Sequence, residues 1–309
     1  MSRNGQEGSH KFSMNIKKKR QHKIVEKTPV VAALLMCVLW SVLQQLIAFV
    51  VNLLLSLVIS GYNDMSGPVG LVVSIAVMMA VYKWWFRPEF EGMLKGDLPK
   101  GFLLGLFELG FVILSFLLSA LTGYQINPKP LSAQILFVSL AAGMSEELVF
   151  RGVVVSTLMR QWKDQNKFRT AALVSGIIFG LIHTLNVFVG ADPLGTLFQV
   201  ISAIGIGVFF SAVYLRTGSI VPCMFYHTVH DILAIAGSSG VTDSGIIATS
   251  SLDKSDLINL VLTVVLAAIA FYMLRDDKNE EMRAIWNRKW KPAVDAEEMQ
   301  EENLPPEAE

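Results

Sequence analysis

Residues 132–158 read SAQILFVSLAAGMSEELVFRGVVVSTL, and this stretch decides the class of fold. It is long and apolar enough to cross a lipid bilayer as a helix, which takes about 20 such residues. Three ionisable side chains, Glu146, Glu147 and Arg151, nevertheless stand in its interior. Charges at membrane depth are costly, so those that occur face protein or water, are paired, and commonly mark function. The stretch therefore predicts a membrane helix that contributes to a polar site.

The composition of the whole chain agrees with a membrane protein. Of its 309 residues, 52% are hydrophobic and only 17% are charged, which is less charge than a soluble domain of this size carries. The other apolar runs expected to span the membrane are 30–60, 67–86, 101–122, 170–190, 195–215, 219–237 and 257–274. We therefore expect an all-α polytopic membrane protein with about eight transmembrane helices and an intramembrane polar site.

The basic residues give an independent test of this span map. With eight spans and a cytoplasmic N-terminus, all 26 lysines and arginines except Lys129, Lys254 and Arg151 fall in segments on the cytoplasmic side. The positive-inside rule predicts this bias. We expect a multi-pass protein of the plasma membrane with both termini in the cytoplasm. Its parts are a disordered basic tail at 1–29, a membrane domain at 30–274, and a C-terminal tail at 275–309 that is acidic and disordered at its end.

Ionisable groups recur in two other spans. Span 170–190 contains His183, and span 219–237 contains His227 and Asp231. At a helix rise of about 1.5 Å per residue, Glu146, His183 and His227 lie roughly 18, 20 and 12 Å from the cytoplasmic ends of their helices. Three separated helices thus bring polar groups to similar depth, which allows one shared site.

The spacing within each helix suggests a role for each residue. Glu147 and Arg151 are four residues apart, so they share a helix face and can form an ion pair that braces the site. Glu146 is turned by about 100° from Glu147, and it is therefore free to face a cavity and act as a general base. His227 and Asp231 are also four residues apart, so Asp231 can orient His227 or fix its tautomer.

A carboxylate and two histidines from different helices support two kinds of chemistry. They can activate a water for hydrolysis and stabilise the resulting oxyanion. They can also hold a catalytic zinc ion, for which the ligands would be Glu146, His183 and His227. No serine or cysteine stands in a recognisable nucleophile motif. The lone Glu108 in span 101–122 is expected to reach toward the cytoplasmic mouth without a role in the site, and His230 is expected to be structural.

The order and spacing of these residues resemble the CPBP family, the CAAX-protease and bacteriocin-processing or Abi family of intramembrane proteases. Its eukaryotic relative is the Ras-converting CAAX endopeptidase. The family pattern has two adjacent glutamates followed by an arginine, then phenylalanine followed by histidine, then histidine followed by asparagine or aspartate. The matching residues are Glu146, Glu147, Arg151, Phe179, His183, His227 and Asp231. The resemblance is specific to a core at about 132–237.

The resemblance implies an intramembrane endopeptidase that hydrolyses a peptide bond of a membrane-associated protein or peptide. Such members process CAAX proteins, bacteriocins or signal peptides. Carried over from the family, Glu146 and His183 activate the attacking water, while His227 and Asp231 stabilise the oxyanion. Asp231 stands where the eukaryotic members have asparagine, and an ionised aspartate cannot donate a hydrogen bond to an oxyanion. Zinc-dependent and metal-free, glutamate-dependent hydrolysis both stay open.

Two other classes of function compete with hydrolysis. The resemblance also allows a non-catalytic membrane regulator or bacteriocin-immunity protein. Intramembrane Glu, His and Asp are typical of ion-coupled transporters too, but the chain shows no inverted repeat. The expected partners are the lipid bilayer and a membrane-associated substrate. A nucleic acid is not expected, because the basic residues sit in tails and loops without a nucleic-acid-binding module.

Overall fold

The computed structural model describes residues 27–59, 68–85, 89–122, 129–237, 241–242, 247 and 254–290. The tail predicted to be disordered at 1–29 lies outside these residues except for 27–29, and so does the end of the C-terminal tail, from 291 on. Within the described part the chain is helical, and its β-pairing is limited to two isolated bridges, Phe90 with Trp290 and Val241 with Ile247. The all-α prediction is confirmed.

Every predicted span is a helix or a continuous run of helices. The elements are α2 (Pro29–Val58), α3 (Pro68–Trp85), α4 (Leu98–Leu121), α5 (Ala133–Glu147), η1 (Leu148–Val155), α6 (Ser156–Trp162), α7 (Phe168–Ile182), η2 (His183–Val189), α8 (Pro193–Thr217), α9 (Val221–Gly237), α10 (Lys254–Met273), η3 (Asp276–Lys278) and α11 (Asn279–Lys289). Six runs in the described part are long and apolar enough to cross a membrane. The α3 helix is a shorter apolar helix, and α9 is short and carries the site histidine.

The helices begin and end where the local sequence dictates. Asp97, Ser132 and Asp192 precede α4, α5 and α8, and each side chain accepts a hydrogen bond from a backbone N–H of the first turn. At the other end of α8, Gly218 has φ +76°, a left-handed conformation that glycine adopts without steric cost. These caps fix the ends of the helices that surround the site.

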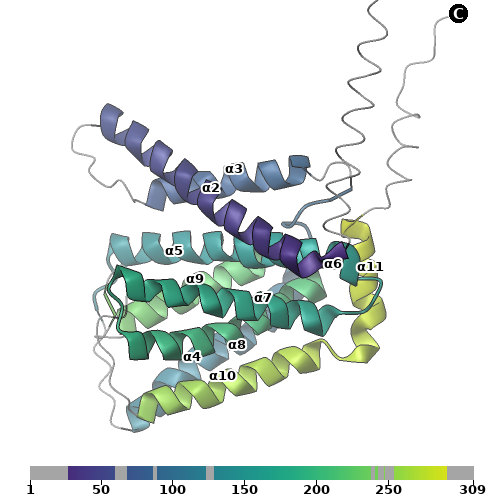
Figure 1. Cartoon of the computed structure of the whole chain (residues 1–309). Helices are drawn as coiled ribbons and strands as arrows, with labels where there is room; N and C mark the ends of the chain where they lie inside the picture. Colours follow the sequence, from purple (N-terminus) through teal and green to yellow (C-terminus); the bar gives the residue numbers. More distant parts are fainter. Residues whose placement is uncertain are drawn as a thin grey trace, which may run out of the picture.

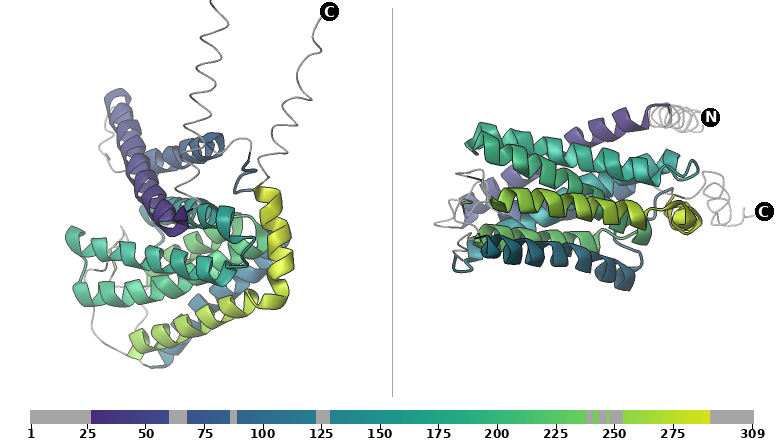
Figure 2. Two further views of the ribbon diagram at one scale, coloured as in Figure 1. Left: turned by 45° about the vertical axis from the view of Figure 1, so that its right-hand side comes forward. Right: turned by 90° about the horizontal axis from the view of Figure 1, so that it is seen from below.

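The α8 helix is the centre of the bundle. It packs against α7, α10, α4 and η2 (Figure 1), and its residues from Gly205 to Thr217 are buried without a break. The α2–α3 pair lies on one side of this bundle and α10 on another, as the two further views also show (Figure 2). A helix that is apolar all round is expected at the centre of a membrane bundle.

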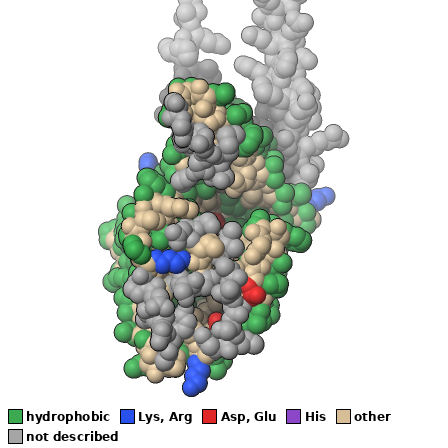
Figure 3. All heavy atoms as spheres, turned by 90° about the vertical axis from the view of Figure 1, so that its left-hand side faces the viewer, with side chains coloured by type: hydrophobic (Ala, Val, Ile, Leu, Met, Phe, Trp, Pro, Cys, Tyr) green, Lys and Arg blue, Asp and Glu red, His purple; other side chains and the backbone are tan. Residues whose placement is uncertain are grey.

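The outward faces of the helices are strongly apolar. Large hydrophobic side chains of α2, α4 and α10 are exposed, among them Leu57, Leu103 and Val264. Seen from the end opposite α11, hydrophobic side chains rim the molecule and charged ones are few (Figure 3). In water such a surface would aggregate, whereas in lipid it meets a matching solvent. The chain is a multi-pass membrane protein.

The α11 helix crosses one end of the bundle, where the described chain also begins (Figure 1). No helix was predicted for residues 275–290. Trp286 is buried and donates from its indole N–H to the Leu215 carbonyl at 3.2 Å, and Arg216 pairs with Glu281 at 3.0 Å. The Lys289 ammonium donates to two carbonyls of residues 92–95, at 2.7 and 2.9 Å, and burial lowers the pKa of this lysine to about 8. Both ends of the described chain therefore lie on the same side, as an even number of spans requires.

Candidate active site

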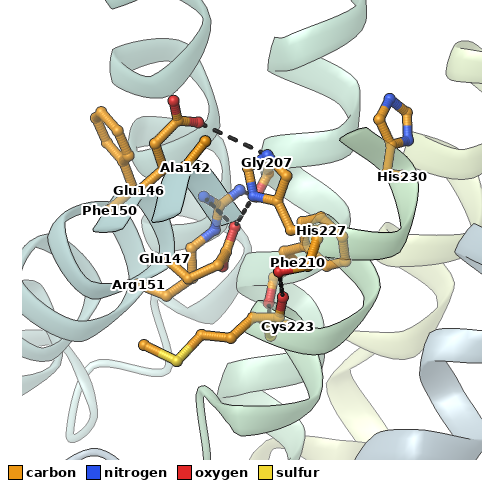
Figure 4. A network of polar contacts seen from close by, with 12 residues as sticks. Ala142, Glu146, Glu147, Phe150, Arg151, Gly207, Phe210, Cys223, His227 and His230 are labelled. Carbon is orange, nitrogen blue, oxygen red and sulfur yellow. Dashed lines mark hydrogen bonds and ion pairs between the residues drawn. The ribbon is translucent and has the colours of Figure 1, made fainter. Parts of the chain in front are cut away.

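The Glu147 carboxylate is the centre of the polar cluster inside the membrane domain. Its Oε1 atom lies 2.9 Å from the Arg151 guanidinium and 2.8 Å from the Nδ1 atom of His227 (Figure 4). Glu147 and Arg151 are completely buried. The ion pair predicted from the spacing of Glu147 and Arg151 is present, and it also holds the ring of a histidine from another helix.

Besides Glu147, a carbonyl and two aromatic rings stabilise the buried cation of Arg151. Its Nη2 atom donates to the Gly207 carbonyl at 3.2 Å, and its guanidinium lies 4.6 Å from the ring centre of Phe179 and 5.6 Å from that of Phe210. A side chain at position 207 would clash, since a Cβ there would lie 2.9 Å from the Gly176 Cα. Glycines on α7 and α8 thus let the two helices approach closely and bring a carbonyl to the arginine.

A π-helical segment follows the two glutamates directly. The helix changes from α to π at Leu148 and returns to α at Ser156, so Arg151 lies within the wider turns. Such π segments are rare and are frequent at functional sites. This segment was not predicted, because the apolar residues on either side of Arg151 fit either type of helix.

Glu146 faces the open side of this cluster. Its side chain is 32% exposed in a structure without lipid, and its Oε2 atom lies 3.6 Å from the Nε2 atom of His227. The two adjacent glutamates therefore contact opposite nitrogens of the same imidazole (Figure 4). Glu147 is neutralised by Arg151, whereas Glu146 has no such cation and can reach a substrate or a water.

Two aromatic rings hold the imidazole of His227. Phe210 stacks on it with ring centres 5.6 Å apart and an angle of 23°, and Phe179 meets it edge-on at 5.7 Å and 87°. Phe179 was identified from its sequence motif. Phe210 was not identified, because nothing in the sequence distinguishes one phenylalanine in an apolar span from the others. Together with Glu147, these rings leave the imidazole little freedom to rotate.

His183 lies at the boundary between α7 and the 3₁₀ segment η2. Its Nδ1 atom is 2.8 Å from the Phe179 carbonyl, and its ring meets the Phe179 ring edge-on at 4.9 Å. A carbonyl only accepts, so Nδ1 carries the proton and Nε2 is left with a free lone pair when the ring is neutral. Among the described residues His183 has no hydrogen bond or ion pair to Glu146 or His227, and Phe179 is the side chain that both histidines contact.

The comparison with known families decides what kind of domain this is. The family model described as Type II CAAX prenyl endopeptidase Rce1-like matches residues 128–233. Over these residues the chain is similar to this family. The matched range contains all the residues placed in the cluster above, from Glu146 to Asp231, and the family is a protease family. No curated protein and no solved structure matches the chain.

Within the Rce1-like domain, Asp231 lies beside the His227 imidazole, on the side away from Glu147. Its Oδ1 atom lies 3.8 Å from the Nε2 atom of His227, and its side chain is 23% exposed. The Nδ1 atom, which decides the tautomer, is held instead by Glu147. Asp231 therefore joins Glu146 on the open side of the imidazole. From the spacing within α9, Asp231 was expected to orient His227 or fix its tautomer. Glu147 of α5 is the residue that holds Nδ1, because it lies closer to the ring.

The structure of the Rce1-like domain shows whether its side chains are arranged to bind a metal ion. In the part of the chain that the structure describes, no group of three or more His, Cys, Asp or Glu side chains is arranged to hold a metal ion. Nδ1 of His227 is hydrogen-bonded to Glu147 and Nδ1 of His183 to a backbone carbonyl, so only the Nε2 atom of each ring could bind a metal ion. The set of Glu146, His183 and His227 considered for zinc does not converge on one point in this arrangement.

Glu108 and His230 form a second buried pair outside this cluster. The Oε1 atom of Glu108 lies 2.6 Å from the Nδ1 atom of His230, and Glu108 is completely buried between α4 and α9. The expectation that Glu108 reaches toward a membrane surface is therefore wrong. A buried carboxylate in a membrane helix needs a partner, and the histidine on the neighbouring helix provides it.

Proposed function

We propose that this chain is an intramembrane endopeptidase that hydrolyses a peptide bond of a membrane-associated protein or peptide, with Glu146 as general base. The proposal rests on the different contacts that the two adjacent glutamates make. The Glu147 carboxylate pairs with Arg151 and with the Nδ1 atom of His227, whereas Glu146 is accessible and lies 3.6 Å from Nε2 of the same ring. A general base must reach the water that it activates, and Glu146 is the carboxylate of the pair that does so.

The proposed reaction uses one water and the Glu146 carboxylate. Glu146 takes a proton as the water oxygen attacks the carbonyl carbon of the scissile bond. The tetrahedral intermediate carries a negative oxygen, which the Nε2–H group of His227 stabilises when both ring nitrogens are protonated. When the intermediate collapses, the C–N bond breaks and Glu146 returns its proton to the leaving amine. The buried Glu147 carboxylate supports this step, because it favours a protonated imidazole from the Nδ1 side.

His183 and Asp231 complete the open side of the proposed site. With its Nδ1 proton donated to the Phe179 carbonyl, His183 has a free Nε2 lone pair that can accept a hydrogen bond from the attacking water. Asp231 lies 3.8 Å from Nε2 of His227, close enough to orient the protonated ring. Because an ionised carboxylate cannot donate, we assign Asp231 to His227 and not to the oxyanion directly.

We derive no step through a metal ion, because the described side chains do not converge on one. A metal-free mechanism predicts that chelation with 1,10-phenanthroline leaves the rate unchanged after dialysis. A loss of activity that added Zn²⁺ restores would instead favour the zinc reading of Glu146, His183 and His227.

The test is hydrolysis of a farnesylated peptide that ends in a CAAX sequence, a probe chosen from the family match. We expect Glu146→Gln and His183→Ala to lower kcat/KM by about 10²–10⁴-fold, the usual contribution of acid–base catalysis. Asp164→Asn is the matched control, because Asp164 is an exposed carboxylate outside the cluster. Undiminished cleavage in both active-site variants would refute the proposal. It would then favour a membrane regulator or immunity protein, for which these side chains are dispensable.

We also propose the orientation in the membrane. The end of the bundle with α11 is the cytoplasmic one, because basic side chains near the ends of helices, such as Lys100, Arg160 and Arg216, gather there in ion pairs. Both termini then face the cytoplasm. A reporter fused to either terminus would read as cytoplasmic in bacterial cells, and a periplasmic reading for one of them would contradict the orientation.

A further inference from the structure

The α9 helix carries ionisable groups on two of its sides. His227 faces Glu147 on α5, whereas His230 points away from that cluster (Figure 4) and pairs with Glu108 on α4. The Phe111 ring of α4 stacks on His230 at 6.3 Å with an angle of 11°. The Glu108–His230 pair therefore lies on the interface between α4 and α9, and the proposed reaction does not use it.

Close packing on two glycines and a further hydrogen bond complete this interface. A Cβ at Gly101 would lie 2.5 Å from Cγ of Pro222, and a Cβ at Gly105 would lie 2.0 Å from the ring of Tyr226. The Tyr226 hydroxyl donates to the Phe102 carbonyl at 2.8 Å. Small residues let membrane helices approach closely. The glycines set the distance between the two helices, whereas their rotation depends on directional contacts, which here are the Tyr226–Phe102 hydrogen bond and the Glu108–His230 contact.

Rotation of α9 matters because His227 and His230 lie on the same helix, about 60° apart around its axis, and therefore turn together. A side-chain tip lies about 5–6 Å from the helix axis, so a rotation of about 20° moves it by about 2 Å. The contact between Nδ1 of His227 and Glu147 is 2.8 Å long and would be lost. A misplacement of about 1 Å at a reacting group can cost about 10²-fold in rate.

We propose that Glu108 and His230 are positioning residues that fix the rotation of α9, and thereby aim His227 and Asp231 at Glu146. The proposal rests on the proposed peptidase function. The 2.6 Å contact is directional, so it specifies one rotation where the glycines do not. The second carboxylate oxygen, Oε2 of Glu108, is buried and has no hydrogen-bond partner among the described residues, so the pair stands apart from any wider network. A buried ion pair that costs desolvation is best explained by its effect on register.

The first experiment measures kinetics on the farnesylated CAAX peptide with purified, monodisperse protein. We expect Glu108→Leu, His230→Leu and the double variant to lower kcat by about 10²-fold and to change KM by less than about threefold. The double variant removes both charges, so it should be at least as stable as either single variant and yet equally slow. The exchanged pair, Glu108→His with His230→Glu, restores the contact and should recover kcat to within about tenfold of wild type.

The matched control is Ser115→Ala, which removes another polar contact of α4, the hydrogen bond to Asn259 on α10. This variant should keep the wild-type kcat. A role in stability alone would lower the melting temperature of the Glu108 and His230 variants and leave kcat per folded molecule unchanged. That result would overturn the proposal.

A second measurement reads the rotation of α9 without any reaction. Spin labels at Phe225→Cys on α9 and Leu140→Cys on α5 both sit at lipid-facing positions. We expect the Glu108→Leu/His230→Leu variant to shift or broaden their distance distribution by about 2 Å, and Ser115→Ala to leave it unchanged. An unchanged distribution would refute the positioning role. If wild type and Glu146→Gln were both inactive, the proposed function would fail, and the label distances alone would still decide whether the pair sets the rotation.

Discussion

Replacing Glu147 by leucine tests how the site tolerates charge inside a membrane. Glu147 and Arg151 are both completely buried, and one carboxylate oxygen contacts both Arg151 and His227. The substitution removes the anion and leaves the guanidinium where water cannot reach it. We therefore expect Glu147→Leu to destabilise the fold strongly and to release His227 from its position.

The magnitude follows from what Arg151 retains. Breaking a buried ion pair by removing one partner costs about 3–5 kcal/mol. Arg151 would keep the Gly207 carbonyl and the face of Phe179, so we expect the lower end, about 3 kcal/mol. The double variant Glu147→Leu/Arg151→Met leaves no buried charge, and it should recover about 2 kcal/mol of that loss.

The assay is equilibrium unfolding in mixed detergent micelles, followed by tryptophan fluorescence, with peptidase activity measured on the same samples. Asp276→Ala is the control, because the Arg169–Asp276 pair at 3.5 Å is exposed on both sides. It should change stability by only about 0–1 kcal/mol. Both Glu147 variants should lose at least about 10²-fold in kcat, since His227 has lost its Nδ1 partner in each.

Three results would refute this reasoning. A Glu147→Leu variant as stable as Asp276→Ala would mean that Arg151 finds water or lipid phosphate in place of Glu147. A double variant less stable than the single one would mean that the pair stabilises the fold outright. A double variant that regained activity would show that His227 does not depend on Glu147.

Three further predictions concern the surroundings of the site. Asp231→Asn should keep kcat/KM within about tenfold while Asp231→Ala loses about 10²–10³-fold in steady-state kinetics; equal losses would contradict a polar role. Gly105→Ala places a Cβ 2.0 Å from a tyrosine ring and should cost about 1–3 kcal/mol in thermal unfolding, whereas Gly110→Ala meets nothing within 4 Å and should be neutral. Burial lowers the pKa of Lys289 to about 8 from 10.5. Between these two pH values the undocked helix binds more protons than the docked helix, so docking of α11 strengthens as the pH rises through this range. Hydrogen exchange of α11, corrected for intrinsic rates, checks this, and Lys289→Met should show no such rise.

The fold followed from the sequence to a large extent, because a bilayer allows few solutions. Apolar runs of sufficient length must be helices there, so the eight ranges became eight helical segments, and the even count placed both described ends on one side. The π segment at Leu148–Val155 and the docked helix α11 were not predictable in this way. Both depend on contacts with other helices, and no local pattern records those contacts.

The candidate residues of the site were also chosen from the sequence alone. Ionisable residues are expensive in a bilayer, so Glu146, Glu147, Arg151, His183 and His227 could be singled out from a single chain, and the ion pair four residues apart followed from helix geometry.

Which partner each group takes was decided by tertiary structure. Glu147, and not Asp231, holds the Nδ1 atom of His227, and Glu108 turned inward to His230. Periodicity fixes the face of its own helix on which a side chain lies. Only packing fixes the rotation of one helix against the next, and hydrogen bonds of 2.6–2.8 Å depend on that rotation.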